Sequence, residues 1–282
     1  MDVFKVACIE NSAGSDIEEN LKLVGDLVEE AVLTSNATLV CLAEYYCVLK
    51  SSDEEYLDNS FRFEGHPALL HSKKLAKKFN IWMLLGSIPV YQGKKKIKNR
   101  SVVVDPRGDI AGYYDKIHLF DVAIKDGQHY RESSFVSAGN EAKIVTLPWG
   151  RLGLTVCYDV RFPHLYRVLA SSGAEFLSVP AAFTQKTGEA HWHTLVRARA
   201  IETGSYIFAP AQCGVRSWGR KTYGHSLIVD PWGNILAEGA GEEGFITAEI
   251  DTKKVLKCRS MIPSLSHNKI ITKPKISSNF NF

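Results

Sequence analysis

A short pattern centred on a turn occurs twice in this chain, and it constrains the fold more than any other feature. Residues 104–110 read Val-Asp-Pro-Arg-Gly-Asp-Ile, and residues 229–235, 125 positions later, read Val-Asp-Pro-Trp-Gly-Asn-Ile. Pro and Gly between two runs of β-favouring residues are typical of a hairpin. Chance recurrence of such a turn is one interpretation. The interpretation that we prefer is two similar α-β halves with no linker between them.

The runs around these turns alternate between strand-like and helix-like patterns. Asp16 is placed to cap a helix that continues to about Ser35. Further helices are predicted at residues 66–80, 163–172 and 189–203. Strands are predicted at residues 3–9, 38–43, 81–88, 101–105, 110–114, 143–147, 152–156, 175–179, 206–209, 226–230, 235–237 and 245–250. One sheet in each half with helices outside predicts an α/β fold, a four-layer α-β-β-α sandwich.

The length and the composition of the chain are sufficient for the core of such a sandwich. Among 282 residues, 45% are hydrophobic and 23% are charged, which excludes disordered, collagen-like and disulfide-dense small proteins. No stretch rich in Ser, Gly or Pro interrupts the chain. We therefore expect one domain over residues 1–260, followed by a basic C-terminal tail over residues 261–282.

The charge is unevenly placed along the chain. Residues 252–282 hold seven basic residues and no acidic one, whereas the preceding residues hold 27 basic and 31 acidic ones. A nucleic-acid-binding protein needs a basic stripe on its folded body, so we expect no nucleic-acid partner. The tail is better suited to solvent or to contact with another subunit.

The cysteines and the hydropathy bear on the compartment. The six cysteines include no C-x-x-C pair, and residues 1–5 lack the layout of a signal peptide. No run approaches 18 apolar residues, so no membrane-spanning helix is expected. Together these features predict a cytoplasmic protein with free thiols and no membrane partner.

Cys157 stands where a nucleophile would be exposed. It follows the apolar run of residues 152–156, and Pro163 is favoured in the first turn of a helix. Cys157 is therefore expected on a sharp turn between strand and helix. A helix N-terminus and nearby cations would favour its thiolate. A buried structural cysteine is the alternative.

Two charged residues are predicted at the same edge. Glu44 ends the apolar run of residues 39–43, and Lys116 follows a predicted hairpin strand. A loop acid exposed to solvent and a surface lysine paired with Asp115 are the alternatives. All three candidates, with Cys157, come just after a predicted core strand, where α/β folds place functional groups. A thiol, an ammonium and a carboxylate form a set suited to acyl transfer.

These residues carry a resemblance to a known family. The chain resembles the nitrilase superfamily of carbon–nitrogen hydrolases over roughly residues 3–260, and it is most similar to the omega-amidase and deaminated-glutathione-amidase branch. The matching segments are Leu42-Ala43-Glu44, Tyr114-Asp115-Lys116-Ile117-His118-Leu119-Phe120-Asp121, Val156-Cys157-Tyr158-Asp159-Val160-Arg161-Phe162-Pro163, His191-Trp192, residues 197–203 and Tyr223-Gly224-His225-Ser226.

The resemblance implies roles for the catalytic residues. Cys157 would be the nucleophile, Glu44 the general base and Lys116 the electrostatic stabiliser of the charge on the carbonyl oxygen. Glu132 matches a second carboxylate in the pocket, although a surface acid paired with Arg131 is the alternative. The implied reaction is hydrolysis of a small carboxylated amide through a thioester, with release of ammonia or an amine.

The resemblance also implies residues of the substrate pocket. The backbone N–H of Tyr158 would meet the same negative charge as Lys116. Arg161 would bind the substrate carboxylate near Phe183 and Thr187, because a guanidinium pairs with a carboxylate through two hydrogen bonds. A structural pair between Arg161 and Asp159 is the alternative.

Other functions remain open at this stage. A nitrilase or an N-carbamoyl amino acid amidohydrolase would use the same three residues, and an inactive binding or scaffold homologue would keep the fold. A metal hydrolase is disfavoured, since the side chains of His191 and His193 would point about 200° apart on a helix. No cofactor and no metal are implied. The family suggests a homodimer or a higher homo-oligomer.

Overall fold

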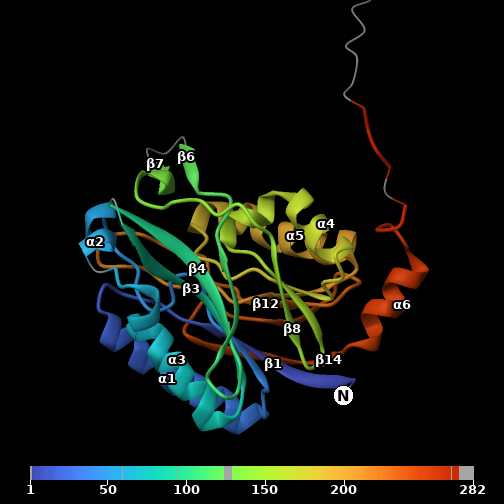
Figure 1. Ribbon diagram of the computed structural model, residues 1–282, viewed down its shortest axis with the longest axis horizontal. Coiled ribbons are helices and arrows are strands. Elements are labelled where there is room, and N and C mark those ends of the chain that lie inside the picture. Colours follow the sequence, from blue (N-terminus) through green and yellow to red (C-terminus); the bar gives the residue numbers. More distant parts are fainter. Residues whose placement is uncertain (1, 59, 94, 124–128, 268, 273–282) are drawn as a thin grey trace, which may run out of the picture.

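The computed structural model describes residues 2–58, 60–93, 95–123, 129–267 and 269–272. Two six-stranded sheets pack face to face, and helices cover their outer faces (Figure 1). This is the four-layer α-β-β-α sandwich predicted from the sequence, and that prediction is confirmed.

The first sheet has the strand order β14-β1-β2-β3-β4-β5. Its strands are β1 (Val3–Glu10), β2 (Leu39–Cys41), β3 (Trp82–Gly93), β4 (Lys96–Val104), β5 (Ile110–Asp115) and β14 (Gly244–Asp251). β1, β2 and β3 run parallel, and the remaining neighbours run antiparallel. The helices α1 (Ile17–Ser35) and α3 (Pro67–Phe79) pack on the outer face of this sheet.

The second sheet repeats this arrangement with the order β13-β12-β11-β10-β9-β8. Its strands are β8 (Lys143–Leu147), β9 (Gly150–Leu154), β10 (Phe176–Ser178), β11 (Tyr206–Ala209), β12 (Leu227–Val229) and β13 (Ile235–Glu238). β9, β10 and β11 run parallel, and the other neighbours run antiparallel. The helices α4 (Pro163–Ser171) and α5 (Gln185–Thr203) belong to this half.

The alternation along β1 shows how the layers are held together. Val6 and Cys8 belong to the core between the two sheets, whereas Ala7 and Ile9 pack in the core beneath the helices. A strand that is buried on both faces needs apolar residues at successive positions, which is why these strands read as continuous apolar runs.

The first helix agrees with its prediction, whereas several short elements were not predicted. The first helix begins after Asp16 as expected, since its side chain accepts a hydrogen bond from the backbone N–H of Glu19 at 3.0 Å. The unpredicted elements are short or lie near the C-terminus: α2 (Asp53–Asp58), β6 (Asp121–Ala123), β7 (His129–Arg131), α6 (Lys253–Met261) and the 3₁₀ turns η1 (Phe63–Gly65), η2 (Glu132–Ser134) and η3 (Cys157–Arg161).

The chain on both sides of the predicted boundary at residue 260 packs on the second half. Arg259 in α6 donates to the carbonyl of Ala174 at 2.6 Å, and Arg167 in α4 donates to the carbonyl of Ser264 at 2.7 Å. Residues 268 and 273–282 of the predicted tail lie outside the described residues. The division of the chain at residue 260 stays a prediction. Among the described residues, none of the helices combines the length and the apolar character needed to span a bilayer.

Candidate active site

A cavity of about 450 Å³ opens where strands of both sheets end. Its lining includes Glu44, Lys116, Glu132 and Cys157. Three of these follow the strands β2, β5 and β9 by a few residues, and Glu132 opens the 3₁₀ turn η2. The two halves of the molecule therefore bring the four predicted residues together at one pocket.

Glu44 is buried at the base of this cavity. Its exposed fraction is 3%, and its Oε1 accepts hydrogen bonds from Lys116 Nζ at 2.8 Å and Asn99 Nδ2 at 2.9 Å. Its Oε2 accepts from the backbone N–H of Ala182 at 2.9 Å. Gly86 in β3 lets its backbone lie close to the residues that precede Glu44, because an added Cβ there would lie 1.9 Å from the carbonyl of Leu42. The carboxylate is thus fixed by partners from both halves.

Lys116 connects two carboxylates. Its ammonium lies 2.8 Å from Glu44 Oε1 and 2.9 Å from Glu132 Oε2, and the lysine is 2% exposed. Glu132 also accepts from the backbone N–H of Phe120 at 2.7 Å and from Asn99 Nδ2 at 3.1 Å. The pairing of Lys116 with Asp115 that the sequence left open does not form: Asp115 pairs with Arg100 instead.

The charges of this group follow from its contacts. Burial opposes the ionised form of Glu44, but the charge of Lys116 and its hydrogen bond outweigh burial, so the pKa of Glu44 is lowered. Burial also opposes the charge of Lys116, yet the carboxylates of Glu132 and Glu44 raise its pKa well above the ordinary value. The carboxylate and the ammonium are therefore both charged at neutral pH.

Cys157 occupies a strained backbone position. It is the first residue of η3 and has φ +48°, in the left-handed region that non-glycine residues rarely adopt. Its N–H donates to the carbonyl of Pro180 at 2.9 Å. This geometry is the sharp strand-to-helix turn predicted from the sequence.

Asp159 holds that turn in place. Its carboxylate accepts from the N–H of Val156 at 2.8 Å, the hydroxyl of Tyr114 at 2.8 Å and the N–H of His118 at 3.0 Å. Its side chain is completely buried. The predicted alternative of a pair between Asp159 and Arg161 therefore gives way to a buried carboxylate that fixes the loop of the thiol.

The resting state of the thiol differs from the expectation. Burial and the nearby charge of Glu44 raise the pKa of Cys157 well above its ordinary value, although Lys116 acts in the opposite direction. Cys157 and Glu44 line the same cavity, and each affects the pKa of the other. The pocket therefore holds a protonated thiol beside an ionised carboxylate, and not the thiolate expected from a helix N-terminus.

Comparisons with known proteins identify the family of the chain. The model of the family described as "Carbon-nitrogen hydrolase" matches residues 5–260. The chain belongs to the carbon–nitrogen hydrolase family. It is 36% identical over 277 residues to a "Deaminated glutathione amidase" of Yersinia enterocolitica, with 96% of both chains covered. It is 38% identical over 271 residues to one of Synechocystis sp., covering 95% of this chain and 98% of the relative.

A solved structure shares the fold of this carbon–nitrogen hydrolase. The NitFhit protein of C. elegans superposes with a TM-score of 0.89 and 35% identity, covering 95% of this chain and 66% of that longer chain. The resemblance that the sequence motifs carried is confirmed, and with it the expectation of an enzyme that hydrolyses amides.

The predicted substrate residues of this carbon–nitrogen hydrolase separate into two groups. Tyr158, Phe183 and Thr187 line the cavity, whereas Arg161 is not among its lining residues. The Arg161 guanidinium lies 5.3 Å from the centre of the Phe183 ring and 3.3 Å from His191 Nδ1. Arg161 thus lies behind the aromatic wall of the pocket.

Sequence reasoning missed several groups of the pocket. Asn99 bridges Glu44 and Glu132, and Lys50, Arg131 and Arg220 bring further positive charge to the lining. Arg220 Nε is buried and has no hydrogen-bond partner among the residues that the structure describes. No local pattern marked these residues. These residues are far apart in the sequence, and they become neighbours only in the folded chain.

Proposed function

We propose that this chain is a thiol-dependent amidase that hydrolyses a small carboxylated amide of the omega-amidase or deaminated-glutathione type. The observation that carries the proposal is that the Cys157 thiol lines the same cavity as the ionised Glu44 carboxylate, which lies 2.8 Å from the Lys116 ammonium. The names of the curated relatives support the substrate class.

The first half of the reaction makes a thioester. Glu44 removes the proton from Cys157 as sulfur attacks the amide carbon, and the carbonyl oxygen gains negative charge. Lys116 and the N–H of Tyr158 stabilise that charge. The C–N bond then breaks while Glu44 passes its proton to the nitrogen. Ammonia or an amine leaves, and the acyl group stays on sulfur.

The second half returns the enzyme to its resting state. Water attacks the thioester carbon while Glu44 accepts a proton from it. The C–S bond breaks, the carboxylic acid leaves, and the sulfur regains the proton from Glu44. Glu132 keeps Lys116 oriented between the two carboxylates throughout, since both of its oxygens accept from Nζ at 3.1 and 2.9 Å.

The positive lining suggests how a carboxylated substrate is held. Within the described part of the chain, Arg220 Nε is a buried donor without a hydrogen-bond partner, and a substrate carboxylate would satisfy it. Lys50 is less available, because its ammonium already donates to the carbonyl of Ser15 at 2.6 Å. Arg161 stays a second proposal for this role, as a cation behind Tyr158 and Phe183.

The proposal is tested by ammonia release from four substrate types: 2-oxoglutaramate, deaminated glutathione, N-carbamoyl amino acids and simple nitriles. For the deaminated tripeptide the released amine is followed instead. Wild type should act on the first two, and Cys157→Ala should lower the rate by about 10⁶-fold, the scale reported when a nucleophile is removed. Retained activity in Cys157→Ala would refute the proposal. Preference for nitriles or carbamoyl compounds would reassign the substrate class.

The two arginines are compared on matched substrates. Arg220→Met should raise KM for a carboxylated amide far more than for its uncharged analogue, and Arg161→Met serves as the paired variant. If both substitutions raise KM equally for charged and uncharged amides, neither arginine binds the carboxylate. If only Arg161→Met discriminates, the cation behind the aromatic wall is the recognition group.

We further propose a homodimer or higher homo-oligomer in a reducing, cytoplasmic compartment. All six cysteines are free. Apolar side chains on α5 and α6 are exposed, with fractions of 54% for Ile201 and 69% for Leu256. Light scattering that finds a monomer at micromolar concentration would contradict the assembly.

A further inference from the structure

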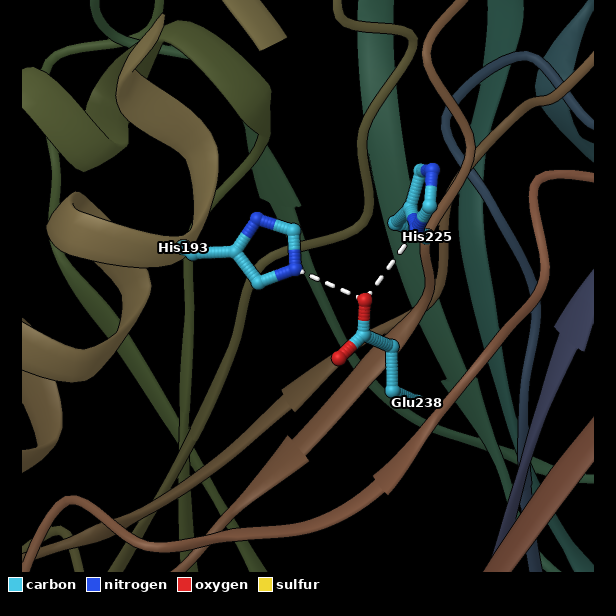
Figure 2. Close-up of side chains that lie close together, drawn as sticks. All are labelled: His193, His225 and Glu238. Carbon is cyan, nitrogen blue, oxygen red and sulfur yellow. Dashed lines mark hydrogen bonds and ion pairs between the residues drawn. The ribbon is translucent and has the colours of Figure 1, made fainter. Parts of the chain in front are cut away.

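Two histidines and a carboxylate meet on the second half, outside the lining of the cavity. His193 lies on α5, His225 lies before β12, and Glu238 ends β13 (Figure 2). All three side chains converge on one point. The proposed acyl-transfer mechanism uses none of them.

The distances within this cluster suit a small ion. His193 Nε2 lies 2.9 Å and His225 Nδ1 lies 3.1 Å from the same carboxylate oxygen, Glu238 Oε1. One atom from each side chain lies within 4.8 Å of the others. Ligands about 2.0–2.1 Å from a tetrahedral ion lie roughly 3.3 Å apart, so two of the three separations already approach those of a zinc site.

The chemistry of the donors selects the kind of ion. Imidazole nitrogen with one carboxylate oxygen is a set that zinc and neighbouring first-row transition metals prefer, whereas magnesium and calcium prefer oxygen alone. We propose that His193, His225 and Glu238 form a binding site for a divalent transition metal, with zinc as the representative ion. The side chains of His193 and His225 are each 30% exposed, and that of Glu238 is 39% exposed. This exposure leaves a coordination position of the ion open to water.

The surroundings of His225 hold one ligand in position. Its φ is +54°, so the residue is kept in a left-handed conformation by its neighbours. Its N–H donates to Glu10 Oε1 at 3.0 Å, and its carbonyl accepts from Trp192 Nε1 at 2.8 Å. Its ring stacks on Tyr223 with 4.4 Å between the ring centres. These contacts restrict the backbone and the ring of His225.

Binding requires small shifts of the three side chains and a local rearrangement of protons. In the described geometry each imidazole faces Glu238 through one ring nitrogen. On metal binding that nitrogen presents its lone pair, and a neutral imidazole keeps its proton on the other ring nitrogen. The ion would replace two hydrogen bonds by three coordinate bonds. It would also tie α5 to the segment that leads from the pocket residue Arg220 to β12.

The test measures binding of Zn²⁺ to tag-free protein by titration calorimetry. The background is Cys157→Ala, because the pocket thiol is itself a zinc ligand. We expect one equivalent of Zn²⁺ on this background. His193→Ala, His225→Ala and Glu238→Gln should each weaken binding at least ~10-fold, the lower end of the cost of losing an outer partner. Mg²⁺ should not compete.

The matched control is His191→Ala, on the same helix and bound to Arg161 outside the cluster. It should bind Zn²⁺ as the background does. Co²⁺ should give the visible absorption of a site with histidine ligands, and Glu238→Gln should alter that spectrum. Since Glu238→Gln conserves shape, its unchanged thermal midpoint without metal would exclude misfolding. Absence of binding, or equal binding in all four variants, would overturn the proposal.

Discussion

The two halves share a fold but contribute different chemistry. β1 to β5 with β14 have the same pattern of parallel and antiparallel neighbours as β9 to β13 with β8. The first half supplies the charged groups Glu44 and Lys116, whereas the second supplies the thiol of Cys157. The backbone of the two halves is therefore repeated, whereas the side chains that follow the strands and line the cavity differ between them.

The two repeated turns also share their backbone hydrogen bonds but differ in their surroundings. Asp105 accepts from the N–H groups two and four residues later at 2.9 Å each, and Asp230 does the same at 2.8 and 2.9 Å. Asp105 pairs with Arg107, whose side chain is 80% exposed. Asp230 is completely buried and pairs with Lys254 of α6. Equal turns thus have unequal surroundings.

After loss of the nucleophile itself, the next largest effect should come from Glu44→Gln, which tests whether the first half supplies the base. Glutamine keeps much of the hydrogen bonding but cannot accept the thiol proton. We expect kcat/KM for ammonia release to fall by roughly 10²–10⁴-fold. Glu132→Gln is the matched control, because Glu132 contacts the same lysine. Equal losses in the two variants would show that Glu44 acts only through Lys116.

The next effect concerns stability and the ammonium that joins both carboxylates. Lys116→Met leaves Glu44 and Glu132 buried without their shared cation, and loss of one partner of a buried ion pair costs about 3–5 kcal/mol. Urea unfolding at pH 7 should show this loss. The double variant Lys116→Met, Glu132→Gln should recover part of it, since one uncompensated charge is removed. No recovery would mean that packing of the lysine stem, and not charge, sets the stability.

The part of the fold that was predicted from sequence rests on local signals. Asp16 caps its helix through atoms three residues away, and strands buried on both faces read as apolar runs. The positions of Glu44 and Cys157 at one edge of the sheets could be predicted because each residue comes just after such an apolar run. The charge state of Cys157 was not predictable in this way, because burial and the Glu44 carboxylate come from tertiary packing.

The residues missed from sequence are joined only by distant contacts. Arg220 reaches the pocket from a loop with no pattern of its own. His193 was weighed against His191, two positions away, whereas its neighbours in space are His225 and Glu238. The spacing of His191 and His193 along one helix excludes them as joint ligands of one metal ion. It carries no information about ligands that neighbouring strands could supply. Such clusters appear only when the sheets are assembled.

The smallest effect compares the two turns directly. Asp230→Ala leaves buried N–H groups and the Lys254 ammonium without their acceptor, so we expect a loss of about 2–3 kcal/mol. Asp105→Ala should cost about 1 kcal/mol, because the turn is closer to solvent and water replaces part of the lost bonding. Urea midpoints at pH 7 measure both. Equal losses would show that the backbone of the turn, and not its burial, determines the contribution.

The pH dependence sharpens the same comparison. Burial opposes ionisation of Asp230, but hydrogen bonds from Lys254 and Asn234 outweigh it, and the pKa lies below the ordinary 3.8. A carboxyl whose pKa is lowered by folding stabilises the protein above its unfolded pKa, and the contribution is lost as pH falls through the folded pKa. The difference between wild type and Asp230→Ala should therefore be constant from pH 7 to about pH 5 and shrink below about pH 4. A difference that instead grew on acidification would mean that Asp230 is protonated in the folded protein, and Lys254 would then contribute no attraction at this turn.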